Sequence, residues 1–315
     1  MAQYILKRVL LLIPKVLILS FIIFAFLKLA PGDAVDFLIP PEIAATASPE
    51  KLNALREELG LNDGFFVQYF NWLKNMAQGN LGYSDVTGVS IRSILMARLP
   101  ITFELMGLSL LFSTLFGTLL GYISAVKNNT LTDYSLTTFG MLGISLPEFF
   151  VALLLVFVFA ISLHWLPTGG RMSSDTSRYM HLILPCAALV INLMASFMRY
   201  VRNAMQDTLN MDYVKTARSK GLSPVKVNVR HAFRNALIPI VTIVVSRISF
   251  LVTGAVAIET VFNFIGLGKL MVESVNMHDL PVLMMSTFLI SSMTLVLTLV
   301  TDIIAALLDP RIRME

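Results

Sequence analysis

"DYVKTARSKGLSPVKVNVRHAFRNALIP", residues Asp212 to Pro239, is a polar and basic segment that lies between two long apolar runs. Asp212 can cap a first short helix, and Gly221 suits the left-handed backbone position just past a helix end. Ser223 can cap a second helix, with Pro224 in its first turn. The sequence therefore predicts two helices joined by a tight corner, the second of which continues into the next apolar run.

The composition indicates a membrane protein. Of the 315 residues, 56% are hydrophobic and only 14% are charged, whereas soluble domains are about 25% charged. A soluble core cannot bury this much apolar surface, so the bilayer is the expected solvent. The net charge of +4 is too small to indicate nucleic acid. The single cysteine excludes an internal disulfide, and the four histidines lack neighbours at metal-ligand spacing, so no metal is expected.

Six segments are long and apolar enough to cross about 30 Å of hydrocarbon as helices. They are Val9–Leu29, Ile101–Val126, Leu136–Leu163, Leu182–Met198, Ala236–Val261 and Pro281–Leu308. The expected fold class is all-α, a polytopic membrane protein with six transmembrane helices, in which residues 1–315 form one transmembrane domain. We expect the first segment to be an uncleaved anchor, because Pro31 directly follows the best cleavage position.

Basic residues in the short flanks predict the orientation, since Lys and Arg are enriched in cytoplasmic loops. One side holds eight basic residues from Arg199 to Arg234, together with Lys7, Arg8, Lys127, Arg311 and Arg313. The short loops of the other side hold only Arg171, Arg178 and Lys269. Both termini and the 199–238 loop are therefore expected in the cytoplasm, and residues 30–100 form a large extracytoplasmic loop.

This large loop has predicted helices of its own. Ser48 can cap a helix that starts at Pro49 and ends at Gly60. "FFVQYFNWLKNMAQGNLG", from Phe65 to Gly82, reads as a second short helix. Its aromatic residues favour a belt at the membrane surface, and a surface for an external partner is the alternative.

Three interpretations compete for the basic corner around Gly221. It can be an anchor that holds the loop in the cytoplasm and contacts anionic lipid. It can be a DNA-reading helix-turn-helix, although a duplex would then collide with the membrane. It can be a docking element for a cytoplasmic motor, in which Ala217 and Gly221 keep one face slim for a partner's groove.

A family resemblance supports the third interpretation. "KTARSKGLSPVKVNVRHAFRNALIP" resembles the loop with the pattern Glu-Ala-Ala-x-x-x-Gly that marks the permease subunits of ABC transporters. Ala217 and Gly221 match this pattern, whereas Lys215 and Thr216 depart from its Glu and Ala. "GNLGYSDVTGVSI", "RLPITFELMGLSLL", "LGISLPEFFVALLLVFVF", "AIETVFNFIGLGKL" and "ALLDPRIR" also resemble binding-protein-dependent peptide permeases. The chain is most similar to the first of the two permeases of the dipeptide/oligopeptide importer family.

The resemblance implies the fold of such permeases and a set of partners. These are a second, similar permease, two cytoplasmic ATPase subunits that hold ATP and Mg²⁺, and an extracytoplasmic substrate-binding protein. The expected location is the cytoplasmic (inner) membrane of a bacterium or archaeon. The residues expected to dock on the ATPase are Asp212, Tyr213, Lys215, Thr216, Ala217, Arg218, Lys220, Gly221 and Leu222.

The chain itself is not expected to be an enzyme or to hold a cofactor. No G-x-x-x-x-G-K-[ST] phosphate loop occurs in the sequence. The nearest string, "NFIGLGKL" from Asn263 to Leu270, lacks the first glycine and has a leucine where a magnesium-binding hydroxyl is needed. We interpret it as an outer turn after the fifth span.

Polar residues within the spans are the candidates for the translocation path. Arg247 lies well inside span five, and an ion at the bilayer centre costs from about 2.5 kcal/mol upward, so it should face the bundle interior or water. Its candidate partners are the carboxylate of a peptide, Glu259, Asp302 or the second permease. The residues expected to line the path with Arg247 are Asn192, Ser246, Ser249, Thr253 and Glu259.

Two further acidic positions have specific interpretations. Glu148 follows Pro147 in "SLPEFF", at a predicted kink in span three, and is a candidate for a gate. Asp302 and Asp309 are expected to pair with Arg311 or Arg313 at the inner end of span six.

The sequence thus predicts a permease subunit of an ATP-driven ABC importer for di- and oligopeptides. One alternative keeps this machine and changes the cargo to nickel chelates, glutathione or oligosaccharides. Another is an ion-driven secondary transporter with Glu259 or Asp302 as proton carriers. The last is a membrane-tethered DNA-binding regulator.

Overall fold

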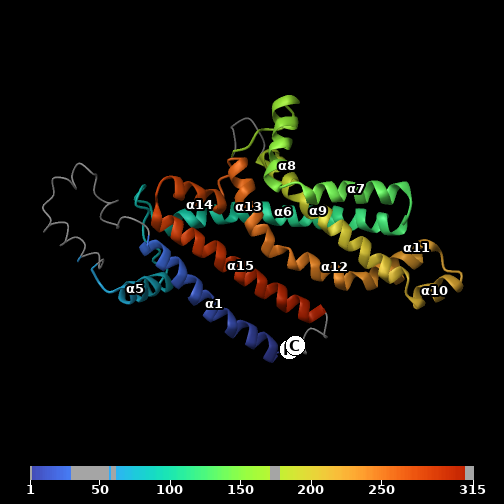
Figure 1. Ribbon diagram of the computed structural model, residues 1–315, viewed down its shortest axis with the longest axis horizontal. Coiled ribbons are helices and arrows are strands. Elements are labelled where there is room, and N and C mark those ends of the chain that lie inside the picture. Colours follow the sequence, from blue (N-terminus) through green and yellow to red (C-terminus); the bar gives the residue numbers. More distant parts are fainter. Residues whose placement is uncertain (1, 30–56, 58–61, 171–177, 309–315) are drawn as a thin grey trace.

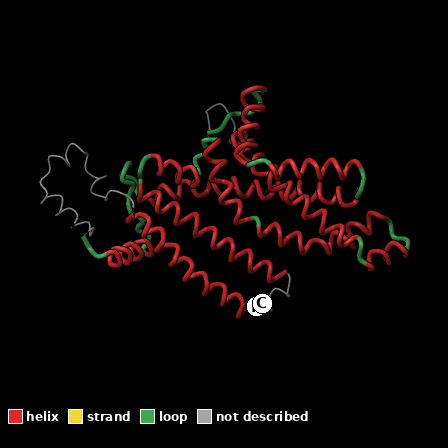
Figure 2. Tube along the Cα trace, viewed as in Figure 1, coloured by secondary structure: helices red, strands yellow, loops and turns green. Residues whose placement is uncertain are grey.

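The computed structural model describes residues 2–29, 57, 62–170 and 178–308. In these ranges the fold is all-α, as predicted, with one isolated β-bridge between Tyr83 and Ser90 (Figure 2). The long helices are α1 (Ala2–Leu29), α6 (Ile91–Val126), α9 (Arg178–Leu209) and α15 (Leu280–Leu308). Shorter elements are α5 (Phe65–Ala77), α7 (Leu131–Ser145), α8 (Glu148–Leu155), η1 (Val156–Ser162), α10 (Asp212–Ser219), α11 (Pro224–Lys226), η2 (Val227–Phe233), α12 (Arg234–Ser246), α13 (Ile248–Val261) and α14 (Leu267–Asn276).

Five continuous helical stretches in the described residues are long and apolar enough to cross a membrane. A sixth span is obtained when α7 and α8–η1 are counted as one bent pair, which agrees with the predicted number. Figure 1 shows α1 and α15 side by side, and α10 and α11 together at the end of the molecule farthest from α5.

The third predicted span is broken rather than straight. Its two halves meet at an angle of 104°, and the break falls between Ser145 and Glu148. Pro147 explains the position, because proline disfavours helical backbone in the preceding residue, and Leu146 is extended with φ −90° and ψ 133°. The predicted kink before Glu148 is confirmed, whereas one continuous helix over Leu136–Leu163 is wrong.

The fifth predicted span also differs from the expectation. The helical run begins at Pro224, well before Ala236, and it is divided at Arg247 into α12 and α13. Arg247 has φ −84° and ψ −8°, which is the sparsely populated region between helix and strand. This residue therefore lies at a helix junction.

The centre of the bundle is the contact between α6 and α9. An added Cβ at Gly117 would lie 2.6 Å from the Cβ of Phe197, and one at Gly121 would lie 2.6 Å from the carbonyl oxygen of Met198. The two backbones can approach this closely only because both positions lack a side chain.

Helix α1, at the amino-terminal end of the chain, packs along α15. Arg8 of α1 donates to Asp302 of α15 at 2.8 Å, a partner that the sequence did not predict, while the predicted pairing of Asp302 with Arg311 or Arg313 stays a prediction. Asp309, Arg311 and Arg313 lie outside the described residues, as does the predicted helix from Ser48 to Gly60 apart from position 57.

The predicted short helix from Phe65 is confirmed as α5. The rings of Phe65, Tyr69 and Trp72 pack on Phe24 of α1 at centroid distances of 5.4, 5.5 and 5.6 Å. The Tyr69 hydroxyl is also 2.8 Å from Ser20 Oγ. One face of α5 is therefore part of the packed protein, while other aromatic residues of the helix, Phe66 and Phe70, are exposed.

Candidate coupling and translocation sites

The basic corner forms a small helical elbow, which we define as residues 209–233. Val214 and Ala217 of α10 and Val227 of η2 are buried together, and this contact folds the two helical pieces onto each other. Gly221 has φ +77°, so the predicted left-handed corner is confirmed. A side chain is disfavoured there by the backbone conformation, although space is open around it.

The ends of the elbow helices differ in detail from the prediction. Met211, not Asp212, occupies the N-cap position of α10. Asp212 is the first helical residue, and its carboxylate accepts a hydrogen bond from Lys215 Nζ at 2.9 Å. Ser223 does precede α11, but its side chain makes no capping hydrogen bond, while Pro224 occupies the first turn as predicted.

Ala217 faces the inside of the elbow. It is 6% exposed and packs with Val214 and Val227. The prediction that Ala217 keeps the outward face slim is therefore wrong, since its small size allows α10 to lie close to η2. Leu222 is half-buried against the same cluster.

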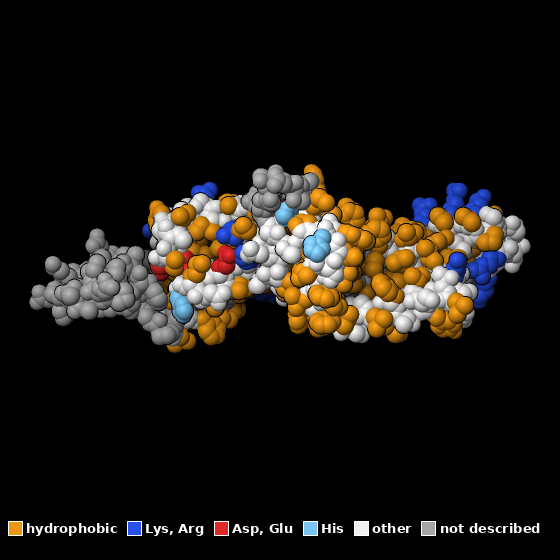
Figure 3. All heavy atoms as spheres, turned by 90° about the horizontal axis from the view of Figure 1, so that it is seen from above, with side chains coloured by type: hydrophobic (Ala, Val, Ile, Leu, Met, Phe, Trp, Pro, Cys, Tyr) orange, Lys and Arg blue, Asp and Glu red, His pale blue; other side chains and the backbone are white. Residues whose placement is uncertain are grey.

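The outward face of the elbow is basic and carries one aromatic ring. Figure 3 shows Lys and Arg gathered at this end of the molecule. The exposed residues of the predicted docking set are Asp212, Tyr213, Lys215, Thr216, Arg218, Lys220 and Gly221. These side chains do not pack inside the elbow, so they are free to contact another protein.

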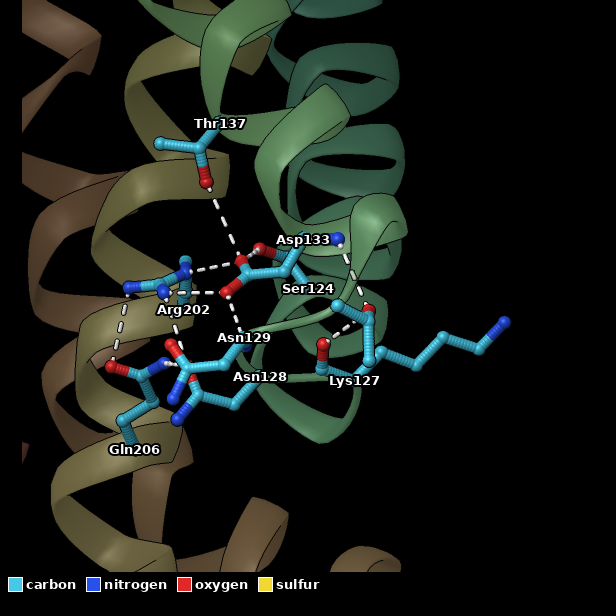
Figure 4. Close-up of polar contacts among 9 residues, drawn as sticks. Ser124, Lys127, Asn128, Asn129, Asp133, Thr137, Arg202 and Gln206 are labelled. Atoms are coloured by element: carbon cyan, nitrogen blue, oxygen red, sulfur yellow. Dashed lines mark hydrogen bonds and ion pairs between the residues drawn. The ribbon is translucent and has the colours of Figure 1, made fainter.

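A partly buried ion pair ties the turn between α6 and α7 to α9 (Figure 4). Arg202 donates from Nε and Nη2 to the two carboxylate oxygens of Asp133, both at 2.7 Å. Ser124 Oγ and the backbone N–H of Asn129 donate to the same carboxylate at 2.5 and 3.0 Å. The sequence interpretation missed this pair, although an aspartate at the start of an apolar helix is a signal for such a partner.

A cavity of about 600 Å³ lies where both broken spans meet α9. Three of the predicted path residues, Asn192, Arg247 and Thr253, line it together. Glu148 and Arg199 also line it, and sequence reasoning had not connected either of them with Arg247. The cavity combines these polar groups with apolar and aromatic walls.

Neither predicted acidic partner contacts Arg247. Glu259 is fully buried and accepts hydrogen bonds from Thr102 Oγ1 at 2.6 Å and from the backbone N–H of Gly268 at 2.7 Å. It also accepts from the N–H of Lys269 at 3.1 Å, so this carboxylate caps the start of α14. Glu259 therefore has a structural position, and the prediction that it lines the path is wrong.

Two hydroxyl groups of the predicted path also lie elsewhere. Ser246 Oγ donates to the carbonyl oxygen of Ile243 at 2.7 Å within its own helix. Ser249 Oγ is 3.1 Å from Thr298 Oγ1 of α15 and so joins two helices. Neither Ser246 nor Ser249 lines the cavity around Arg247, and their place on the translocation path stays a prediction.

An all-α membrane bundle with broken spans, a basic elbow at one end and a polar cavity at the helix breaks is the architecture expected of a transport permease. Residues 117–314 match the family described as binding-protein-dependent transport system inner membrane component, and residues 1–106 match the N-terminal model of such membrane components. The chain belongs to this family. It is a multi-pass membrane permease subunit of an ABC importer.

Several relatives match over almost the whole chain. A putative peptide permease protein of Brucella suis is 40% identical over 99% of both chains. The oligopeptide transport system permease protein AppB of Bacillus subtilis is 38% identical over 99% of both chains. The glutathione transport system permease protein GsiC of Escherichia coli is 36% identical, again over 99% of both.

Solved structures share the fold at low identity. The inward-facing MetNI methionine ABC transporter has a TM-score of 0.58 at 15% identity, over 69% of this chain and 96% of that chain. An amino acid ABC transporter solved with histidines has a TM-score of 0.54 at 16% identity, over 68% of this chain and 93% of that chain.

Proposed function

We propose that this chain is one of two permeases in an importer of short peptides, and that the elbow is its contact with the ATPase subunits. Peptide cargo is supported by the names of the relatives, which are peptide, oligopeptide and glutathione permeases. Glutathione is itself a small peptide, so all three names share one chemical class.

The observation that carries the proposed coupling role is the geometry of the elbow. It is a folded helical unit with a buried core of its own, and it presents a basic outward face at one end of the bundle. A rigid element can convert the closure of two ATPase subunits into a rearrangement of packed helices. In this proposal the ATPase subunits hold ATP and Mg²⁺, and this chain holds neither.

The proposed orientation follows from the basic residues. The elbow carries Lys215, Arg218 and Lys220 on its exposed surface, and such residues are enriched on the cytoplasmic side of membranes. Both termini then lie in the cytoplasm of a bacterium or archaeon, and α5 lies outside, where a substrate-binding protein would dock.

An ion-driven transporter is less well supported. Its proposed proton carriers are both engaged: Glu259 caps α14, and Asp302 pairs with Arg8. Neither carboxylate lines the cavity around Arg247.

Reconstitution tests the proposed function. The permease pair, its ATPase subunits and its binding protein are placed in proteoliposomes with radiolabelled tri-alanine outside and ATP inside. We expect uptake that requires ATP and the binding protein. Uptake by the permease pair alone under an ion gradient would contradict the proposal.

A further inference from the structure

The cavity at the helix breaks contains charges of both signs. Glu148 approaches it from the first residue of α8, while Arg199 and Arg247 approach it from α9 and the α12–α13 junction. The Glu148 carboxylate lies directly over Gly254, where an added Cβ would be 2.6 Å from Glu148 Oε2. The missing side chain at Gly254 therefore makes room for this carboxylate.

These charges have no ionic partner within the described part of the chain. The structure gives Glu148 no hydrogen bond and no ion pair there, and the guanidinium of Arg247 contacts only the rings of Tyr200 and Phe250, at 6.0 and 5.9 Å. Arg199 lies 5.9 Å from the same Tyr200 ring, on the exposed side of α9. Asp133 and Glu259, by contrast, accept hydrogen bonds from other groups of the chain. The charged side chains of the cavity are therefore available to a ligand.

The backbone positions that carry Arg247 and face Glu148 are separated along α12–α13. Gly254, which marks the position of the Glu148 carboxylate, follows Arg247 by seven helical residues, or about 10 Å along the axis. The guanidinium groups of Arg199 and Arg247 both lie about 6 Å from the Tyr200 ring. An extended peptide advances about 3.3–3.6 Å per residue, so about three residues match the rise between these two backbone positions.

We propose that this cavity binds a short zwitterionic peptide by its two ends, with Glu148 at the terminal ammonium and Arg247 and Arg199 at the terminal carboxylate. Planar guanidinium groups suit a carboxylate because they donate paired hydrogen bonds. The volume of about 600 Å³ is within the range of small-molecule sites. Contacts to the ends alone leave the peptide's side chains against apolar and aromatic walls. This inference rests on the proposed peptide cargo.

Equilibrium dialysis tests the proposal with the complete permease–ATPase complex, free of nucleotide and of binding protein. The ligands are radiolabelled tri-alanine, N-acetyl-tri-alanine and tri-alanine amide. Glu148→Gln should weaken binding of tri-alanine about tenfold and leave the acetylated peptide unchanged, since a charged hydrogen bond is lost only with the free amine. Arg247→Gln should weaken tri-alanine and its acetylated form by about tenfold and leave the amide unchanged.

Two further variants separate local effects from folding. Gly254→Ala keeps every charge but displaces the Glu148 carboxylate, and it should act like Glu148→Gln. Lys127→Gln removes a cation whose side chain points away from the polar contacts around Asp133 (Figure 4). This variant should bind all three ligands like the unchanged protein.

The outcomes distinguish this inference from the proposed function. If the unchanged complex shows no saturable tri-alanine binding, or if Glu148→Gln weakens the acetylated peptide equally, the inference is overturned. ATP-driven uptake of tri-alanine by the complete system would still stand in that case. If the complete system shows no such uptake, the proposed function itself fails.

Discussion

Asp85 is a residue whose charge is disfavoured by the fold. It lies in the loop before α6, next to Asp279, which accepts from Ser84 Oγ at 2.5 Å and caps α15 through the N–H of Val282 at 3.4 Å. Partial burial, and then the charge of Asp279, raise the pKa of Asp85 to about 6. The folded state therefore holds this proton more tightly than the unfolded state. The contribution of the protonated carboxyl to the free energy of unfolding is fully present below about pH 4 and is lost as the pH rises through about 6.

Asp85→Asn should therefore stabilise the protein at pH 7.5 and give no such gain at pH 4. We expect about 1 kcal/mol at the higher pH, which allows for solvent screening of a half-exposed group. The measurement is thermal unfolding in detergent at both pH values, with the exposed Asp207→Asn as the control. Equal gains at both pH values would show that the charge of Asp85 is not the cause.

At the scale of elements, the ion pair between Arg202 and Asp133 fixes the α6–α7 turn on α9. The Asp133 side chain is 2% exposed, so Arg202→Ala leaves a buried carboxylate without its cation. Such a loss costs about 3 kcal/mol. Thermal unfolding should show this loss, a smaller one for Arg202→Lys, and none for Lys127→Ala. If Arg202→Ala unfolds like the unchanged protein, the pair does not hold the two elements together.

Two glycines of α6 should respond to alanine substitution with stability changes of opposite sign. Gly117→Ala places a Cβ 2.6 Å from Phe197 and should destabilise the α6–α9 contact by about 1–3 kcal/mol. Gly107→Ala adds a Cβ with nothing within 4 Å and should stabilise the same helix by about 0.5–1 kcal/mol. Thermal unfolding of the two variants in detergent measures both changes. If both variants were more stable, or both less stable, than the unchanged protein, the account of close packing at Gly117 would be contradicted.

Much of the element order could be predicted from the sequence, because its signals are local. Pro147 marks the broken span, and Gly221 marks the corner of the elbow. The contacts of Glu259 and the inward face of Ala217 could not be predicted, since each depends on an element distant in space or on the packing of two helices. The same limit left Glu148 and Arg247 unconnected until the fold brought them to one cavity.

At the scale of the whole molecule, α9 connects the two functional regions. It lines the cavity at Asn192, holds the α6–α7 turn through Arg202, and runs to the elbow that begins at Leu209. A displacement of the elbow would therefore act on the helices around the cavity through continuous packed contacts. This arrangement is the physical basis for our proposal that an ATPase drives the transport path from below.

Co-purification of the ATPase subunits with a tagged permease pair tests the central claim most directly. Thr216 is exposed on α10, and within the described residues its hydroxyl bonds only to the carbonyl oxygen of Asp212 in the same helix. Thr216→Trp therefore adds bulk to the outward face without entering the elbow core. Val86→Trp adds the same bulk to an exposed position in the loop before α6. We predict that Thr216→Trp loses the ATPase subunits while Val86→Trp retains them. Full retention by a folded Thr216→Trp permease would contradict the account.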